Sequence, residues 1–148
     1  MTTMADLQAL RVALSRPGRE VYLFPSVGST NRRALELARS LGGEAVVMAL
    51  EQTAGRGRRG RAWQTTAGYL ALSILLRPQQ PPRRYPDLSF VVAVAVAMAV
   101  EDLTALSVEL KWPNDLLVRG RKVGGILGEA DVEAGVVVSA GLFSLFHL

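Results

Sequence analysis

Arginine and glycine alternate in one short segment, Gly55–Arg61, which contains four arginines and three glycines. Glycine lets a backbone turn tightly around a ligand, and arginine carries a fixed charge on a forked donor that suits phosphate or carboxylate. Like charges packed this closely repel one another unless an anion lies among them. The segment therefore predicts a loop that binds an anion, directly after an apolar strand over residues 45–50.

Composition limits the kind of protein to a globular one. The chain has 148 residues, 49% hydrophobic and 20% charged, which suits one domain over residues 1–148. Its net charge of +4 is small, so we expect a local anion site and not a surface that coats nucleic acid. No cysteine and one histidine exclude disulfides and argue against a metal site. No signal peptide or membrane span is visible, so we expect a cytoplasmic protein without a membrane partner.

The spacing of apolar residues predicts helices packed on a sheet. Helices are expected over 4–15, over 30–41 with Ser29 as the N-cap, and over Phe90–Leu103, a Val/Ala-rich helix that needs burial. Strands are expected at 21–24, 45–50, 69–76, 108–112, 116–118, 123–129 and 136–142, with a proline-rich connection at 78–86 and a hairpin turn at 119–121. The predicted fold class is α+β, a mixed, mostly antiparallel sheet with packed helices.

Other interpretations of the arginine segment can be weighed on the residues alone. Gly55, Gly57 and Gly60 match the G-x-G-x-x-G dinucleotide pattern, but residues 61–68 lack the helical apolar stripe that the pattern needs. A Walker A loop is excluded because no Gly-Lys-Ser/Thr follows. A solvated basic loop stays open, and so does an RNA- or DNA-binding loop that stacks a base on Trp63.

A second group of residues, Lys-Trp-Pro-Asn-Asp at 111–115, ends a predicted strand. Lys111 can offer a point charge to a phosphate or carboxylate there; the alternative is a core tryptophan beside a surface hairpin. Gly124 and Gly125 interrupt a later strand, which indicates close approach of a ligand or backbone, or a β-bulge. We expect the hairpin to bring Lys111 and these glycines onto neighbouring strands.

A third group, Ser29-Thr30-Asn31, stands at the start of a predicted helix. Short polar side chains at this position cap a helix, and they can also present hydroxyl and amide groups to a polar ligand. Gln52 adds one more donor and acceptor just before the arginine segment.

In this order, the segments resemble the catalytic domain of biotin protein ligases. The matching motifs are Ser-Thr-Asn at 29–31, Gln-x-x-Gly-Arg-Gly-Arg-x-Gly-Arg-x-Trp at 52–63, Lys-Trp-Pro-Asn-Asp at 111–115 and Lys-x-Gly-Gly-Ile-Leu at 122–127. The resemblance implies the sheet fold shared with lipoate ligases and class II tRNA synthetases. It implies that biotin and ATP form biotinyl-5′-AMP, and that biotin is transferred to a lysine of a biotin carboxyl carrier domain. Mg²⁺ would bridge the phosphates, largely through water and substrate oxygens.

The same resemblance implies the site residues. For biotin they are Ser29, Thr30, Asn31, Gln52, Arg56, Gly57, Arg58, Lys111, Gly124 and Gly125. For the nucleotide they are Arg56, Arg58, Arg61, Trp63, Lys111 and Asn114. Lys111 and Arg58 are the expected catalytic residues. Joining a carboxylate to a phosphate brings two anions together, so fixed cations and positioning should carry the reaction without a histidine or cysteine.

The chain departs from the family pattern near its end. The family has Gly-x-Gly-Ile/Leu-Asn where this chain has Ser139-Ala140-Gly141-Leu142-Phe143. Because that asparagine lies near the phosphates in the family, a biotin-binding relic without adenylation activity stays an alternative, as does a small RNA-binding module. The family's C-terminal SH3-like barrel and N-terminal winged helix are expected to be absent, so no DNA partner is expected; a homodimer is left open.

Overall fold

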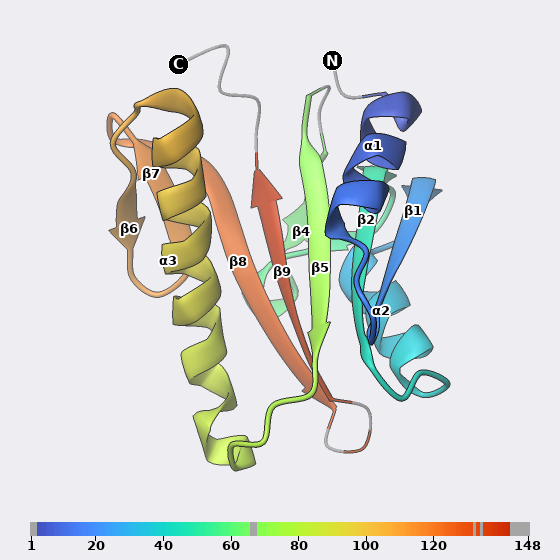
Figure 1. Cartoon of the computed structure of the whole chain (residues 1–148). Helices are drawn as coiled ribbons and strands as arrows, with labels where there is room; N and C mark the ends of the chain where they lie inside the picture. The colour runs from blue at the N-terminus through green and yellow to red at the C-terminus, as the bar shows by residue number, and fades with distance from the viewer. Residues whose placement is uncertain (1–2, 66–67, 132, 134, 143–148) are drawn as a thin grey trace.

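The computed structural model describes residues 3–65, 68–131, 133 and 135–142 and is built on a seven-stranded sheet (Figure 1). In spatial order the strands are β1 (Arg19–Val27), β2 (Glu44–Gln52), β5 (Leu70–Leu76), β9 (Gly135–Leu142), β8 (Arg121–Asp131), β7 (Asp115–Val118) and β6 (Glu109–Lys111). β1 and β2 are parallel, and all other neighbours in this sheet are antiparallel. The predicted fold class, a mixed and mostly antiparallel sheet with helices, is confirmed.

The arginine segment forms a small hairpin of its own. β3 (Gly55–Arg56) pairs with β4 (Ala62–Trp63), and a short helical turn, η1 (Arg58–Gly60), connects them. Gly55 has no room for a side chain, because a Cβ there would lie 2.6 Å from the carbonyl oxygen of Trp63. We call residues 55–63 the arginine loop from here on.

Three α-helices cover the sheet: α1 (Met4–Leu14), α2 (Thr30–Ala38) and α3 (Tyr85–Thr104). Val46 and Met48 of β2 pack in one apolar cluster with α1, whereas Ala45 and Val47 pack in another with α2. Since alternate residues of a strand point to opposite faces, α1 and α2 lie on opposite faces. α3 lies on the same face as α1, in front of β8 in Figure 1.

The β1–α2–β2 unit begins at the residues that the sequence singled out. Parallel strands need a crossover connection, and α2 supplies it. Ser29 caps α2 as predicted, since its hydroxyl accepts a hydrogen bond from the backbone N–H of Arg32. The helix ends at Ala38, earlier than the predicted residue 41, because the backbone closes into a turn in which Leu37 accepts from two following N–H groups.

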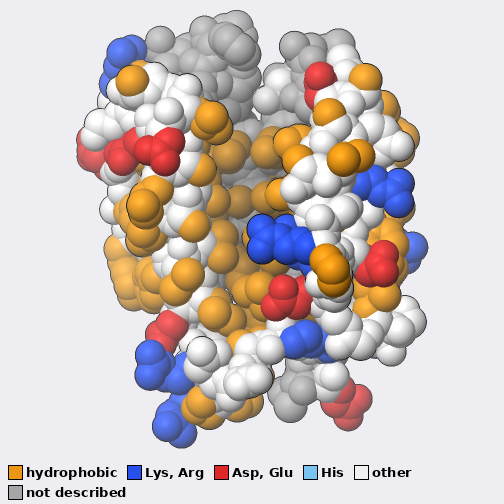
Figure 2. Space-filling view, in the orientation of Figure 1, with side chains coloured by type: hydrophobic (Ala, Val, Ile, Leu, Met, Phe, Trp, Pro, Cys, Tyr) orange, Lys and Arg blue, Asp and Glu red, His pale blue; other side chains and the backbone are white. Residues whose placement is uncertain are grey.

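α3 corrects two predictions. It begins at Tyr85, inside the segment predicted to be a proline-rich connection, because Pro86 is tolerated in the first turn of a helix. It is also only half-buried: Ala93 and Ala97 pack on the sheet, whereas Val91 and Met98 are 62% and 59% exposed. Figure 2 shows hydrophobic side chains along this outer face. A single layer of sheet can cover only one side of a helix, so the burial that this helix was predicted to need is present on one face only.

The strand order also corrects the expected neighbourhood of Lys111. Arg119 and Gly120, with φ of 51° and 74°, form the predicted two-residue hairpin turn. That turn joins β7 to β8, so β7 lies between Lys111 on β6 and the glycine pair on β8. Lys111 and the glycines are therefore not on neighbouring strands, because residues 115–118 form a strand of their own. Among the described residues, no helix is long and apolar enough to cross a membrane.

Candidate functional site

A narrow polar cavity lies on the α2 face of the sheet, beneath the arginine loop. Its floor crosses three adjacent strands, where Gly125, Gly141 and Ala71 stand opposite one another in register. Two glycines and an alanine leave almost no side chain on this row, which is why a cavity exists here. The residues that line it are Ser29, Thr30, Asn31, Gln52, Arg56, Gly57, Trp63, Tyr69, Ala71, Asn114, Gly125, Ile126, Leu127, Ser139, Ala140 and Gly141.

The glycines of the floor are required by two aromatic rings. A Cβ on Gly141 would lie 2.0 Å from the Tyr69 hydroxyl, and one on Gly125 would lie 3.0 Å from the Trp63 ring. Burial raises the pKa of Tyr69 to about 12, and a hydrogen bond with Trp63 opposes this effect. Gly125 thus marks close approach of a side chain, while Gly124 is crowded by the Gly141 carbonyl and stands beside a register shift in the β7–β8 pairing. Both structural explanations of the glycine pair therefore hold.

The polar wall of the cavity is built from the start of α2. Ser29, Thr30 and Asn31 are all at most 5% exposed. The Gln52 Oε1 accepts from the backbone N–H of Thr30 at 2.8 Å and from its hydroxyl at 3.0 Å. The Gln52 amide is thereby oriented, with its NH₂ left for other partners. These residues form the start of the helix and also line the cavity. Helix capping and presentation of polar groups to a ligand are therefore compatible interpretations.

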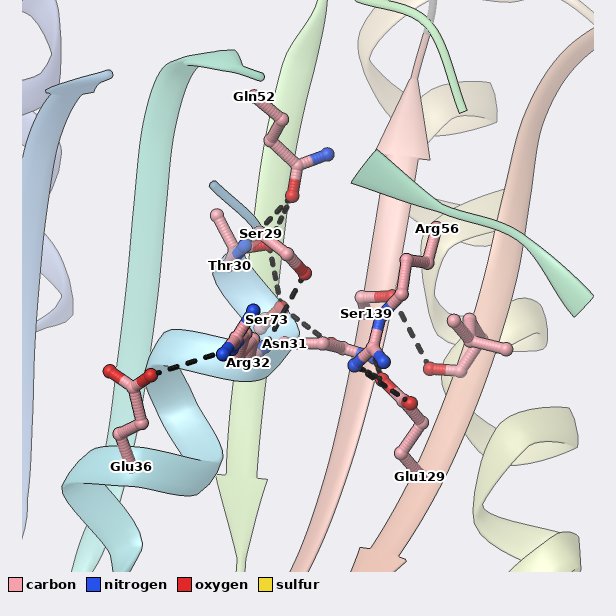
Figure 3. A network of polar contacts seen from close by, with 11 residues as sticks. Ser29, Thr30, Asn31, Arg32, Glu36, Gln52, Arg56, Ser73, Glu129 and Ser139 are labelled. Atoms are coloured by element: carbon pink, nitrogen blue, oxygen red, sulfur yellow. Dashed lines mark hydrogen bonds and ion pairs between the residues drawn. The ribbon is translucent and has the colours of Figure 1, made fainter. Parts of the chain in front are cut away.

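Two polar residues that support this wall from behind the cavity lining were not predicted. Ser73, which is fully buried, lies within hydrogen-bond distance of Thr30 Oγ1 (2.8 Å) and Asn31 Oδ1 (2.7 Å). Glu129 accepts from Asn31 Nδ2 at 2.8 Å and forms an ion pair with Arg56 at 3.0 Å (Figure 3). The two-residue period of a strand gave a signal for both. Ser73 lies two residues after Ala71, and Glu129 four residues after Gly125, so each lies on the same face as that cavity residue.

Ser139, noted only as a departure from the family pattern, also lines the cavity. Its hydroxyl donates to the Leu127 carbonyl at 3.3 Å, so this side chain is attached to the neighbouring strand. Phe143, the second departure, lies outside the described residues.

A cationic recess of about 710 Å³ adjoins the cavity. Arg58, Arg59, Arg61 and Lys122 line it. Lys122 lies 4.9 Å from the centroid of the Trp63 ring and 2.9 Å from Asp115. Asn114 borders both the cavity and the recess, and it is held to β8 by hydrogen bonds with the backbone of Ile126. The positive charge predicted from the sequence is thus gathered next to the cavity.

Four predicted site residues lie apart from the cavity wall, among them Arg61, which lines the recess. Lys111 is exposed on β6, the edge strand, although its register with Asp115 and Gly125 places it on the cavity side of the sheet. Gly124 is buried under the floor, and Arg58 lines the recess and a further apolar groove of about 470 Å³. Among residues that the structure describes, no group of histidines and carboxylates could hold a metal ion.

The size of the cavity indicates that the arginine loop must move for a ligand to enter. The cavity has a volume of about 30 Å³. That is room for roughly two water molecules and not for a bicyclic ligand. Trp63 and Arg56, both carried by the loop, lie over it.

Comparison with known proteins bears on the family to which the chain belongs. The Biotin/lipoate A/B protein ligase family matches residues 23–139. The biotin–[acetyl-CoA-carboxylase] ligase of Paracoccus denitrificans is 49% identical over 69% of this chain and 43% of its own length. The Mycobacterium tuberculosis enzyme of the same name is 39% identical over 93% of this chain and 55% of its own. The chain thus spans about half the length of these relatives.

Solved structures agree in fold. The biotin protein ligase of Aquifex aeolicus in complex with biotin and ATP has a TM-score of 0.71 and 34% identity, covering 82% of this chain and 51% of that one. The Leishmania major biotin protein ligase in complex with biotinyl-5-AMP has a TM-score of 0.73 and 29% identity, covering 86% and 57%. The chain belongs to the Biotin/lipoate A/B protein ligase family.

Proposed function

We propose that this protein activates biotin with ATP and transfers it to a lysine of a carboxylase carrier domain. The observation that carries the proposal is the convergence of four motifs on one cavity: Ser29-Thr30-Asn31, the arginine loop, Asn114 of the 111–115 motif and Gly125 of β8. The relatives named as biotin–[acetyl-CoA-carboxylase] ligases and the neighbours bound to biotin with ATP or to biotinyl-5-AMP support it. The RNA-binding alternative is not favoured by this family membership.

The polar and apolar parts of the cavity suit the two halves of biotin. The Gln52 NH₂ group, oriented by the contacts with Thr30, can donate a hydrogen bond to the carbonyl oxygen of a cyclic urea. Ala71, Trp63 and the glycine floor offer an apolar surface for the remainder of the ligand. We infer that the ureido ring lies against the start of α2 and that the carboxylate points toward the arginine loop.

The adjoining recess suits the nucleotide. Attack of the biotin carboxylate on the α-phosphate brings two anions together, so the main barrier is electrostatic. Arg58, Arg61 and Lys122 surround the recess with fixed positive charge. Mg²⁺ would be held mainly by phosphate oxygens and water, since Asp115, the one carboxylate that the described residues place in the recess lining, is paired with Lys122.

Lys111 fits a role in the reaction only if its side chain turns toward the cavity. Its position in register with Asp115 and Gly125 puts its ammonium group on the correct face of the sheet. We propose that it contacts the biotin carboxylate and the α-phosphate when the ligands are bound. Closure of the arginine loop would then keep water from the mixed anhydride.

Two assays test the proposed function. Calorimetry should detect saturable biotin binding that ATP and Mg²⁺ strengthen, and pyrophosphate release should follow only when both substrates are present. Incubation with a purified biotin carboxyl carrier domain should then yield a biotinylated protein on a streptavidin blot. Absence of binding at millimolar biotin would refute the proposal. Binding without pyrophosphate release would identify the biotin-binding relic.

A further inference from the structure

Glu129 connects two parts of the cavity that are far apart in the sequence. Its carboxylate accepts from Asn31 Nδ2 at 2.8 Å, on α2, and lies 3.0 Å from Arg56 Nη2, on the arginine loop (Figure 3). Its side chain is 27% exposed and that of Arg56 is 46% exposed. One carboxylate therefore ties the polar wall to the loop that covers it.

The orientation of Asn31 follows from its partners. A carboxylate can only accept, so the Asn31 NH₂ must face Glu129, and its carbonyl then faces the Ser73 hydroxyl at 2.7 Å. Asn31 is 2% exposed, so the amide is held by these two contacts inside the protein. Glu129 thus contacts a buried, hydrogen-bonded side chain on one side and the charged arginine loop on the other.

Arg56 differs from the other arginines of the loop. In the part of the chain that the structure describes, Arg56 has a carboxylate partner within salt-bridge distance, whereas Arg58, Arg59 and Arg61 have none. Mutual repulsion among these cations favours an extended, open loop. The contact with Glu129 opposes that tendency at the end of the loop that is closest to the cavity wall.

We propose that Glu129 is a positioning residue that docks the arginine loop onto the cavity through Arg56. The proposal deepens the proposed function, on which it rests for the identity of the incoming anion, the biotin carboxylate. Because the ion pair is partly exposed, it shifts the balance between docked and open loop by no more than about fivefold. A shift of that size favours a closed loop but still allows a ligand to enter.

Limited trypsin digestion of the ligand-free protein tests this role. Trypsin cleaves after arginine, so the rate of cleavage within the arginine loop measures how often the loop opens. Cleavage at the β7–β8 turn (Arg119 and Arg121) serves as the internal reference. Glu129→Gln keeps an acceptor for Asn31 and removes the charge that Arg56 meets. Asp131→Asn is the matched control, because it makes the same change two residues along the same strand, beside Arg39 and away from the loop.

We expect Glu129→Gln to raise the relative rate of loop cleavage about two- to fivefold at low salt. Asp131→Asn should leave this rate unchanged. Salt at about 1 M should abolish the difference between Glu129→Gln and the wild type, because it screens exposed pairs. Equal loop cleavage in Glu129→Gln and the wild type, or an equal rise in Asp131→Asn, would overturn the proposal.

Two further readouts keep the test decisive. If Glu129→Gln does not fold, the test is made on the wild type alone. A rate of loop cleavage that rises with salt, relative to cleavage at the β7–β8 turn, supports the role of Glu129. A relative rate that does not rise overturns it. Biotin binding is measured separately by calorimetry on the wild type. If the digestion test fails but biotin still binds, only the role of Glu129 is refuted. If biotin does not bind, the proposed function is refuted.

Discussion

We expect Gly141→Ala to destabilise the protein more than any other glycine substitution in the cavity floor. A Cβ at this position would lie 2.0 Å from the Tyr69 hydroxyl, 2.9 Å from the ring carbon that carries it and 3.1 Å from Trp63 Nε1. Real Cβ atoms do not approach other atoms at 2.0 Å, so Tyr69 must move. Tyr69 is 3% exposed and has little free space to move into.

The magnitude follows from the cost of overpacking a core. Inserting a methyl group into a filled interior costs about 1–3 kcal/mol, and the short contact places Gly141→Ala near the upper end, about 2–3 kcal/mol. For a domain of this size that loss lowers Tm by roughly 4–12 °C. Gly125→Ala should cost about 1 kcal/mol or less, because its nearest contacts, at 3.0 and 3.2 Å, are with the Trp63 ring, which lies on a loop.

Thermal unfolding followed by circular dichroism measures this series. Gly42→Ala is the control, since a Cβ there meets nothing within 4 Å, and it should be neutral or slightly stabilising. Adding Tyr69→Phe to Gly141→Ala removes the 2.0 Å contact and should recover part of the lost Tm. If Gly141→Ala melts within about 1 °C of Gly42→Ala, the reasoning from the floor geometry is refuted.

Three other predictions concern charge and pH. Arg58→Ala should speed dissociation of biotinyl-5′-AMP about tenfold or more while changing biotin affinity much less, because only the adenylate carries a phosphate; equal losses for both ligands, compared by calorimetry, would contradict this. Lys111→Ala should slow pyrophosphate release about 100-fold, and full activity in that variant would exclude Lys111 from the reaction. The pKa of Tyr69 is raised to about 12 in the folded state, against about 10 when unfolded. The free energy of unfolding that depends on the protonated Tyr69 hydroxyl is therefore fully present below pH 10 and is lost between about pH 10 and 12. Between pH 8 and pH 11, the urea midpoint should fall less in Tyr69→Phe than in the wild type.

Local chemistry made several elements predictable. Ser29 caps α2 because a short side chain at a helix start satisfies a backbone N–H nearby. Arg119-Gly120 forms the hairpin turn because Gly120 readily adopts the positive φ that such a turn requires, although Arg119 adopts it at a steric cost. The arginine loop follows β2 directly, as the change from apolar to charged residues indicates. Each of these features depends on residues a few positions apart.

Long-range packing decided what the sequence pattern missed. Glu129 meets Asn31 across a separation of 98 residues, and nothing local to either residue indicates the pair. Ser73 was overlooked because the strand period puts it on the same face as Ala71 but does not tell that Thr30 and Asn31 lie opposite that face.

The residues of this protein alone determined its family, its strands and helices, and the charged loop, because motif order and apolar periodicity are properties of neighbouring positions. Only the tertiary structure decided that α3 leaves one side uncovered, that β7 separates Lys111 from the glycines, and that a carboxylate from β8 joins α2 to the loop. Those features depend on which strands pair and which helix covers which face, and pairing is set by the summed packing of the whole chain.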